Sequence, residues 1–157
     1  MLGAHVSVSG GLHNGISNGE KFGCSAIQIF VKNPNRWQSK SFTQEEIDRF
    51  CQAWAASEQV KEVIVHDIHL TNLASPKPDI LEKSRQHFQS QIDLVCQLGV
   101  RYLVKHLGSH TGAGEPVGLK NLSQSLDFLL EEAPDLRRLR SRVPEELTVI
   151  CGKAMEK

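Results

Sequence analysis

The sequence predicts an α/β fold in which repeated strand–helix units build one parallel sheet. Short apolar runs bounded by turn residues alternate with amphipathic segments along the 157 residues, and no linker divides the chain. Successive βα units imply parallel strands joined by right-handed crossovers. An open doubly wound sheet and a (β/α)₈ barrel both satisfy this pattern. A complete barrel typically needs about 250 residues, so a barrel interpretation makes this chain little more than half of one.

Roughly five segments carry the short apolar runs expected of strands that are buried on both faces. In chain order they cover residues 2–6, 26–31, 63–65, 102–105 and 147–151. The segment 134–146 before the last of them is biased towards charge by its four arginines. We expect this segment to be a solvated connecting turn, and a phosphate-binding patch is the less favoured interpretation.

Four segments repeat apolar residues at helical spacing, which predicts four helices between the strands. The first covers about residues 13–22. The second begins at a capping box formed by Thr43 and Glu46, and the third begins near Asp79 and stops at Gly99. The apolar faces of the last three helices are Ile47, Phe50, Cys51 and Trp54; Leu81, Phe88, Ile92 and Val95; and Leu119, Leu122, Leu126 and Leu129.

Composition indicates an ordinary globular protein and excludes several classes of function. The formal net charge is zero, which argues against a general nucleic-acid coat protein but not against local phosphate contacts. No run of about 18 apolar residues is present and the N-terminus does not resemble a signal peptide, so we expect a cytoplasmic protein. The four cysteines form no C-x-x-C pair, and we expect reduced thiols packed as small apolar groups.

Three histidines stand where predicted strands end, and this is the main indication of function. His5, His66 and His106 close the first, third and fourth apolar runs. Taken singly, each is more readily interpreted as a separate polar residue at a strand exit than as a metal ligand. Three imidazoles at one topological position favour a shared metal site, because α/β folds place their chemistry where strands end and imidazole is a common zinc ligand.

Residues beside these histidines are candidates for supporting roles. Asp67 is placed to orient the imidazole of a metal ligand without itself binding the metal. Asn72 is placed to brace the long loop that follows the third strand, and Gly108 allows a tight turn beside His106. The exposed segment 32–37 combines cationic, amide and aromatic groups, which contact phosphates and stack on bases, although a simple Pro/Asn turn is also consistent with it.

Five segments occur in an order and spacing that together point to one family. They are Gly3–Ser7 with Gly10–Leu12, Ile29–Pro34 with Trp37, His66–Asp67 with Leu70–Leu73, Glu82–Ser84 and His106–Gly112. Across about residues 1–130 these segments resemble endonuclease IV, the zinc-dependent apurinic/apyrimidinic endonuclease family of base-excision repair. Residues 131–157 diverge from the family.

The resemblance implies a TIM barrel, of which this chain would form about the first half as a single partial domain over residues 1–157. It also implies three zinc ions at the C-terminal mouth of the barrel and cleavage of double-stranded DNA 5′ to abasic sites. His66 and His106 match two zinc ligands, which account for part of one metal site. His5 would lie just behind the ligands. Residues that match the DNA-contacting loops are Asn33, Asn35, Arg36, His69 and Leu70.

Departures from the family affect both the site and the end of the chain. Asn35 stands where an arginine is usual, His69 where an aromatic residue is usual, and Lys105 where an apolar residue is usual. Residues 151–157 replace the family's Glu-Asn-Thr-Ala-Gly motif, so we expect an incomplete chain that associates through unpaired sheet edges and does not cleave DNA alone. The alternatives are an inactive fragment that binds one metal ion weakly and a sugar-isomerase-like metal-dependent barrel. No catalytic residue is assigned.

Overall fold

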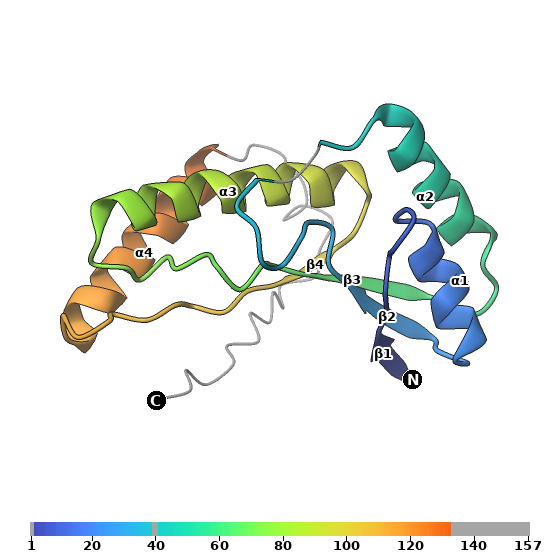
Figure 1. Cartoon of the computed structure of the whole chain (residues 1–157), viewed down its shortest axis with the longest axis horizontal. Helices are drawn as coiled ribbons and strands as arrows, with labels where there is room; N and C mark the ends of the chain where they lie inside the picture. Colours follow the sequence, from blue (N-terminus) through green and yellow to red (C-terminus); the bar gives the residue numbers. More distant parts are fainter. Residues whose placement is uncertain (1, 39–40, 133–157) are drawn as a thin grey trace. The chain divides into compact units, whose positions relative to one another are not determined.

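The computed structural model describes residues 2–38 and 41–132, where four strands and four helices alternate along the chain (Figure 1). Their bounds are β1 (Gly3–His5), α1 (Asn14–Lys21), β2 (Ala26–Ile29), α2 (Gln44–Ala56), β3 (Glu62–His66), α3 (Pro78–Gln97), β4 (Tyr102–Val104) and α4 (Glu115–Glu132). The expected strand 147–151 and the arginine-rich segment 134–146 lie outside the described residues. In the described part of the chain, no helix has the length and apolar character needed to cross a membrane.

The four strands are parallel, and each pairs with its neighbour in the sequence, in the order β1-β2-β3-β4. A doubly wound sheet would reverse direction from its first strand, whereas sequential order is that of a barrel wall. The order therefore decides between the two predicted architectures. The paired segments differ from the expected strands by one or two residues at their ends: β1, β2 and β4 stop short of the apolar run, whereas β3 extends one residue beyond it at each end.

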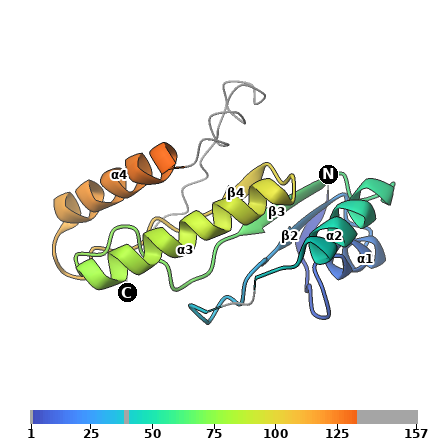
Figure 2. The same cartoon turned by 90° about the horizontal axis from the view of Figure 1, so that it is seen from above.

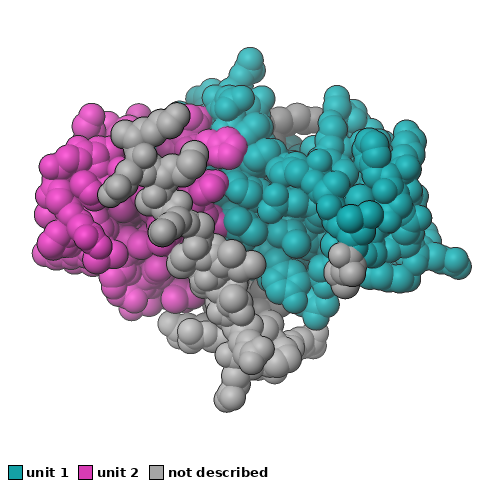
Figure 3. All heavy atoms as spheres, turned by 90° about the horizontal axis from the view of Figure 1, so that it is seen from below, with its two compact units in different colours: residues 1–68, 94–104 teal, residues 69–93, 105–157 magenta. Residues whose placement is uncertain are grey.

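The described chain divides into two compact units (Figure 3). Unit 1, residues 1–68 and 94–104, holds the whole sheet with α1 and α2. Unit 2 comprises residues 69–93 and 105–157. Its described part holds most of α3, the loops that follow β3 and β4, and α4.

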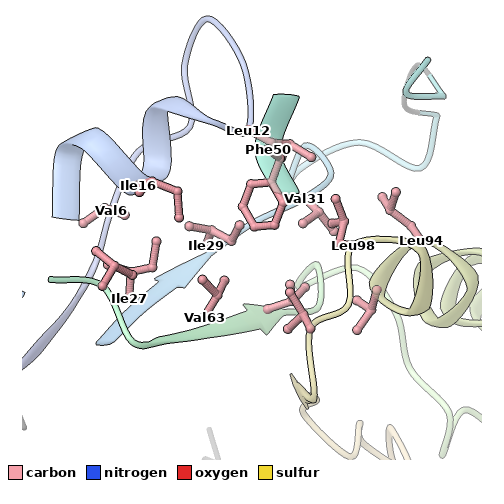
Figure 4. Packing of buried hydrophobic residues seen from close by; sticks show 14 of the residues in the cluster. Val6, Leu12, Ile16, Ile27, Ile29, Val31, Phe50, Val63, Leu94 and Leu98 are labelled. Atoms are coloured by element: carbon pink, nitrogen blue, oxygen red, sulfur yellow. The ribbon is translucent and has the colours of Figure 1, made fainter. Parts of the chain in front are cut away.

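Unit 1 is held together by an apolar cluster between one face of the sheet and its helices (Figure 4). Alternate strand residues such as Ile27, Ile29, Val63 and Val65 are at most 1% exposed, as the two-residue period of a strand requires. From the helical side, the cluster contains Ile16, Ile47, Phe50, Leu94 and Leu98. The residues between the buried strand positions, Gln28, Ile64 and His66, are only half-buried.

Two helix boundaries are as predicted because local hydrogen bonds define them. Thr43 Oγ1 accepts from the backbone N–H of Glu46 at 3.3 Å, while Glu46 Oε2 accepts from the backbone N–H of Thr43 at 2.8 Å. This capping box begins α2. Gly99 follows the end of α3 with a φ of 68°, a left-handed conformation that glycine adopts without strain.

Unit 2 combines few large apolar residues with many buried polar ones. Leu73, Phe88, Ile92 and Leu129 are buried, and so are Thr71, Ser75, Ser84, His87, Gln91, Lys105 and Ser125. The helices α3 and α4 lie side by side (Figure 2), where Arg85 Nε donates to Ser125 Oγ at 2.9 Å. A buried polar group that loses its hydrogen-bond partner costs free energy, so such groups favour one specific local arrangement of the chain.

The predicted apolar face of α4 is partly wrong. Leu129 is buried, but Leu119 is 57% exposed and Leu126 is 39% exposed. The buried face instead carries Gly118 and Ser125, at helical spacing with Leu129. Ser125 Oγ lies 2.6 Å from Asn121 O and 3.2 Å from Leu73 O, so polar contacts as well as leucines orient the helix.

Candidate functional site

The carboxyl ends of β1, β2 and β3 bring two of the predicted histidines together in unit 1. The ring centroids of His5 and His66 are 6.3 Å apart. Phe30, which follows β2, lies 4.5 Å from the His5 ring and 5.3 Å from the His66 ring. Since parallel strands end at the same edge of a sheet, sequence positions 5, 30 and 66 form one cluster there.

His66 has a hydrogen bond that selects its tautomer. Its Nδ1 lies 2.6 Å from the backbone oxygen of Asp67, and a carbonyl oxygen can only accept, so Nδ1 carries the proton. A neutral His66 ring therefore has its lone pair on Nε2. This is how metal-binding histidines are commonly oriented, with one nitrogen donating to a carbonyl and the other directed to the ion.

Asp67 and His5, the two residues predicted to support the metal ligands, make hydrogen bonds near His66. Asp67 is 1% exposed, and its main-chain oxygen accepts from His66 while its Oδ1 accepts from the backbone N–H of Ile68 at 2.8 Å. The Nδ1 of His5 lies 3.0 Å from Gln28 Oε1, an acceptor. Both contacts restrict ring or loop orientation near His66, and the role of each residue in positioning a metal ligand stays a prediction.

A groove of about 760 Å³ opens beside this cluster, entirely within unit 1. Its lining comes from the ends of β1 and β2, from the loops that follow them and from the start of α2: His5–Ser9, Phe30–Pro34, Arg36, Gln38, Ser41, Phe42 and Glu46. Lys32 and Arg36 bring positive charge to it. Glu46 is also part of the α2 capping box, so the same residue begins the helix and lines the groove.

The loop after β2 presents the predicted DNA-contacting residues. Asn33 O accepts from the backbone N–H of Arg36 at 3.3 Å, and Asn33 Oδ1 accepts from that of Asn35 at 3.0 Å. These two bonds form a tight turn of the kind that asparagine stabilises. Asn33, Asn35 and Arg36 are exposed, whereas Trp37 is half-buried.

The remaining predicted residues lie in unit 2, on the loops after β3 and β4. His69 and His106 are exposed, Leu70 is half-buried, and the rings of the two histidines are 5.8 Å apart between centroids. His106 belongs to unit 2 and His66 to unit 1, so their sharing of one metal ion stays a prediction. Among residues 2–38 and 41–132, no group of three or more His, Cys, Asp or Glu side chains is placed to hold a metal ion.

Asn72 braces its loop, as predicted. Its Nδ2 donates to Ser109 O at 2.8 Å, and its Oδ1 accepts from the backbone N–H groups of Ser109 at 2.9 Å and Ala74 at 3.1 Å. Gly108 has a φ of 99°, and a Cβ at this position would overlap Asn72 Oδ1. The tight turn expected at Gly108 is therefore confirmed, and it requires glycine.

Sequence reasoning missed how Lys105 is used. This side chain is 9% exposed; its Nζ donates to Thr71 O at 3.0 Å and to Thr71 Oγ1, and lies 5.5 Å from the centre of the Phe88 ring. The only sequence signal was a charged residue at the end of an otherwise apolar run. Buried lysines are uncommon unless their ammonium is hydrogen-bonded.

His110 shows that a histidine near the site can be structural. Its Nδ1 accepts from the backbone N–H groups of Gly112 and Gly114, both at 3.2 Å. This places the proton of a neutral ring on Nε2 and shapes the loop that enters α4.

The chain is similar to one family model and to many known proteins. Residues 16–137 match the family model described as xylose isomerase-like TIM barrel. A protein of Geotalea daltonii named probable endonuclease 4 is 42% identical over 133 residues, which cover 85% of this chain and 46% of the relative. The chain therefore spans about half the length of such relatives.

Two solved structures share the fold. The crystal structure of endonuclease IV from Thermus thermophilus superposes with a TM-score of 0.73 at 26% identity, covering 85% of this chain and 47% of that one. A D-tagatose 3-epimerase-like protein superposes with a TM-score of 0.62 at 18% identity, covering 86% and 49%. The second likeness concerns the fold alone.

Proposed function

The chain belongs to the xylose isomerase-like TIM-barrel family, and from this premise we propose that it is an endonuclease IV-like, zinc-dependent phosphodiesterase acting 5′ to abasic sites in DNA. The name and 42% identity of the Geotalea daltonii relative support a nuclease of this kind. The described residues would contribute two parts of the site, a metal-binding edge and a DNA-contacting groove.

The metal-binding edge rests on the hydrogen bond between His66 Nδ1 and the carbonyl of Asp67, which is the observation that carries the proposal. It leaves Nε2 of a neutral ring as the metal-binding nitrogen, so the donor chemistry fits zinc. We assign His66 and His106 as zinc ligands and His5 and Asp67 as residues that position them. A zinc ion bound there would act as a Lewis acid towards a phosphate ester.

The groove in unit 1 is the proposed contact for the DNA backbone. Lys32 and Arg36 line it and carry the charges that phosphates require, while the exposed amides of Asn33 and Asn35 extend the same loop. In the loop after β3, Leu70 provides an apolar side chain for contact with DNA. An abasic nucleotide costs little to unstack, which would favour damaged over intact duplex.

The proposal concerns two kinds of partner, DNA and further copies of the chain. Double-stranded DNA that carries an abasic site is the proposed substrate. Association between copies of the chain through the edges of the sheet stays a prediction.

An incision assay tests the proposed function. A labelled duplex with one abasic site would be incubated with zinc and either the chain alone or the chain with the remaining half of the Geotalea daltonii relative supplied as a second polypeptide. We expect no measurable cleavage by the chain alone and zinc-dependent, EDTA-sensitive incision 5′ to the site in the mixture. His66→Ala should lower that incision about 100-fold or more, the scale expected when a metal site loses part of its shell.

Arg36→Ala serves as the matched comparison, because it removes a charge from the groove and leaves the histidines unchanged. It should weaken DNA binding and flatten its salt dependence, with a smaller effect on the maximal rate. The proposal is wrong if neither reaction shows zinc-dependent incision and the abasic duplex binds no better than an intact one.

A further inference from the structure

The loops after β3 and β4 place two exposed histidines beside each other in unit 2. His69 and His106 have ring centroids 5.8 Å apart and ring planes inclined by 36°. His69 occupies the position where the resemblance led us to expect a DNA contact. Its ring instead lies beside the ring of a candidate zinc ligand.

The spacing of the two rings is suitable for a shared ion. Zinc binds imidazole nitrogen at about 2.0–2.1 Å, which places two ring centres on one ion roughly 4.5–5.5 Å apart at ligand angles of about 90–120°, so a shared ion requires these two rings to approach by a few tenths of an ångström. A plain aromatic contact covers a similar range of distances, about 4.5–7 Å. Spacing alone therefore permits a metal site, and the surroundings of the pair must decide.

Those surroundings hold the pair in place from both sides. On one side, the Nζ of Lys105 donates to Thr71 O, joining the residue before His106 to a residue two positions after His69. On the other, Asn72 makes paired hydrogen bonds with Ser109, each residue three positions beyond its histidine. We call these contacts between Lys105 and Thr71, and between Asn72 and Ser109, the loop clasp.

The contact between Lys105 and Thr71 in the loop clasp is buried, and the backbone of Asn72 is anchored to buried structure. Thr71 is 4% exposed, Lys105 is 9% exposed, and the backbone N–H of Asn72 donates to the fully buried Ser84 at 2.9 Å. A binding pair whose backbone is already fixed loses little conformational entropy when it takes up a ligand.

From the ring spacing and the loop clasp, we propose that His69 and His106 form a two-imidazole site for a divalent transition metal ion such as Zn²⁺. Solvent would complete the coordination of the ion, because this pair contributes two protein ligands. The inference rests on the proposed function in taking His106 as a zinc ligand, and it adds a ligand, His69, in place of a DNA contact. Imidazole pairs favour Zn²⁺, Ni²⁺ and Cu²⁺ over Mg²⁺ or Ca²⁺, which prefer oxygen ligands.

Calorimetric titration of the full chain with Zn²⁺ tests the site without any nuclease assay. We expect His69→Ala and His69→Phe each to lower zinc affinity about tenfold or more, because even the loss of a residue that only hydrogen-bonds to a metal ligand has an effect of this size. The Phe variant is decisive because it keeps an aromatic ring beside His106 and removes both nitrogens. His110→Ala is the matched control, since its histidine is on the same loop as His106 but shapes the loop through Nδ1, and it should keep its affinity.

Each outcome separates this inference from the proposed function. If zinc affinity is unchanged in His69→Phe, the inference is wrong, whatever the incision assay shows. If affinity falls in His66→Ala but not in either His69 variant, the metal site of the proposed function stands without His69. If His69→Phe and His106→Ala both lose affinity while incision is never observed, the two-histidine site stands and the proposed function fails. Circular dichroism of every variant confirms that the fold is retained.

Discussion

Unit 1 and unit 2 are stabilised in different ways. Unit 1 packs a sheet against helices through a cluster of buried aliphatic and aromatic side chains, including Ile29, Phe50 and Val65 at 0% exposure. Unit 2 buries Ser84, Gln91 and Ser125 to the same degree and joins its loops through the loop clasp. Apolar burial is nondirectional, whereas hydrogen bonds specify particular atoms.

This difference bears on where the candidate ligands lie. His5 and His66 are held by the ends of paired strands, so the sheet of unit 1 positions them. His69 and His106 are in loops, which are positioned by side-chain hydrogen bonds and not by strand pairing. We therefore expect core substitutions in unit 1 to reduce stability as a whole and clasp substitutions in unit 2 to act locally.

The largest effect should come from Phe50→Ala in unit 1. Phe50 is fully buried, and its truncation should lower the free energy of unfolding by about 3–5 kcal/mol, because a cavity replaces a packed ring. Urea denaturation measures the change. Phe22→Ala is the control, since Phe22 is 69% exposed and its loss should change stability by roughly 0.5 kcal/mol or less. Equal effects of the two substitutions would contradict the assignment of the core.

A smaller and local effect should come from Asn72→Ala in unit 2. It removes three side-chain hydrogen bonds, to Ser109 and Ala74, which are together worth about 1–3 kcal/mol. Hydrogen exchange should accelerate in the segments 69–77 and 105–114, with little change in α1 and α2. Asn72→Asp keeps the acceptor oxygen and loses the donor, so it should lie between wild type and Asn72→Ala. Acceleration spread evenly over both units would show that the loop clasp is not local.

The smallest effect concerns Cys51 on α2. Burial raises the pKa of its thiol above the ordinary value of 9.0, and the carboxylate of Asp48 raises it further. Since only the thiolate reacts, Cys51 should be alkylated more slowly at pH 8 than an exposed thiol, and Asp48→Asn should speed it modestly. The thiol ionises at a lower pH in the unfolded chain than in the folded one. Its contribution to stability is therefore fully present below pH 9.0 and is lost as pH rises through the higher pKa of the folded state. Mass spectrometry of labelled peptides gives the rates, and alkylation as fast as that of a free thiol would contradict the shift.

Sequence patterns predicted unit 1 better than unit 2, for a physical reason. The short apolar runs around Ile27 and Val63 and the capping box at Thr43 are local patterns, and the structure places β2, β3 and the start of α2 there. The expectation that the strands are buried on both faces is wrong for the described residues, because only alternate positions of β2 and β3 are fully buried. The face of α4 was partly wrong because a buried serine, Ser125, is fixed by contacts to residues far away in the sequence. Partners of this kind leave no periodic signal.

The candidate site follows the same rule. The positions of His5 and His66 at strand ends could be read from the sequence, because they depend on where an apolar run stops, whereas His106 lies two residues beyond β4. A bracing role for Asn72 in the loop after β3 could also be read, but its partner Ser109, 37 residues away, could not. The use of Lys105 could not, since its partner Thr71 is 34 residues away. Nor could the sequence show that His69 lies beside His106, because that contact depends on two loops whose shapes are fixed by each other.

Zinc titration of His106→Ala tests the central claim most directly, because His106 is a ligand in both the proposed function and the further inference. Catalytic zinc sites usually have three protein ligands, so we expect weak, partly water-ligated binding in the wild-type chain. His106→Ala should lower that affinity by about tenfold or more while circular dichroism shows an unchanged fold. Unchanged zinc affinity in His106→Ala, or tight stoichiometric binding of three ions by the wild-type chain, would contradict the account.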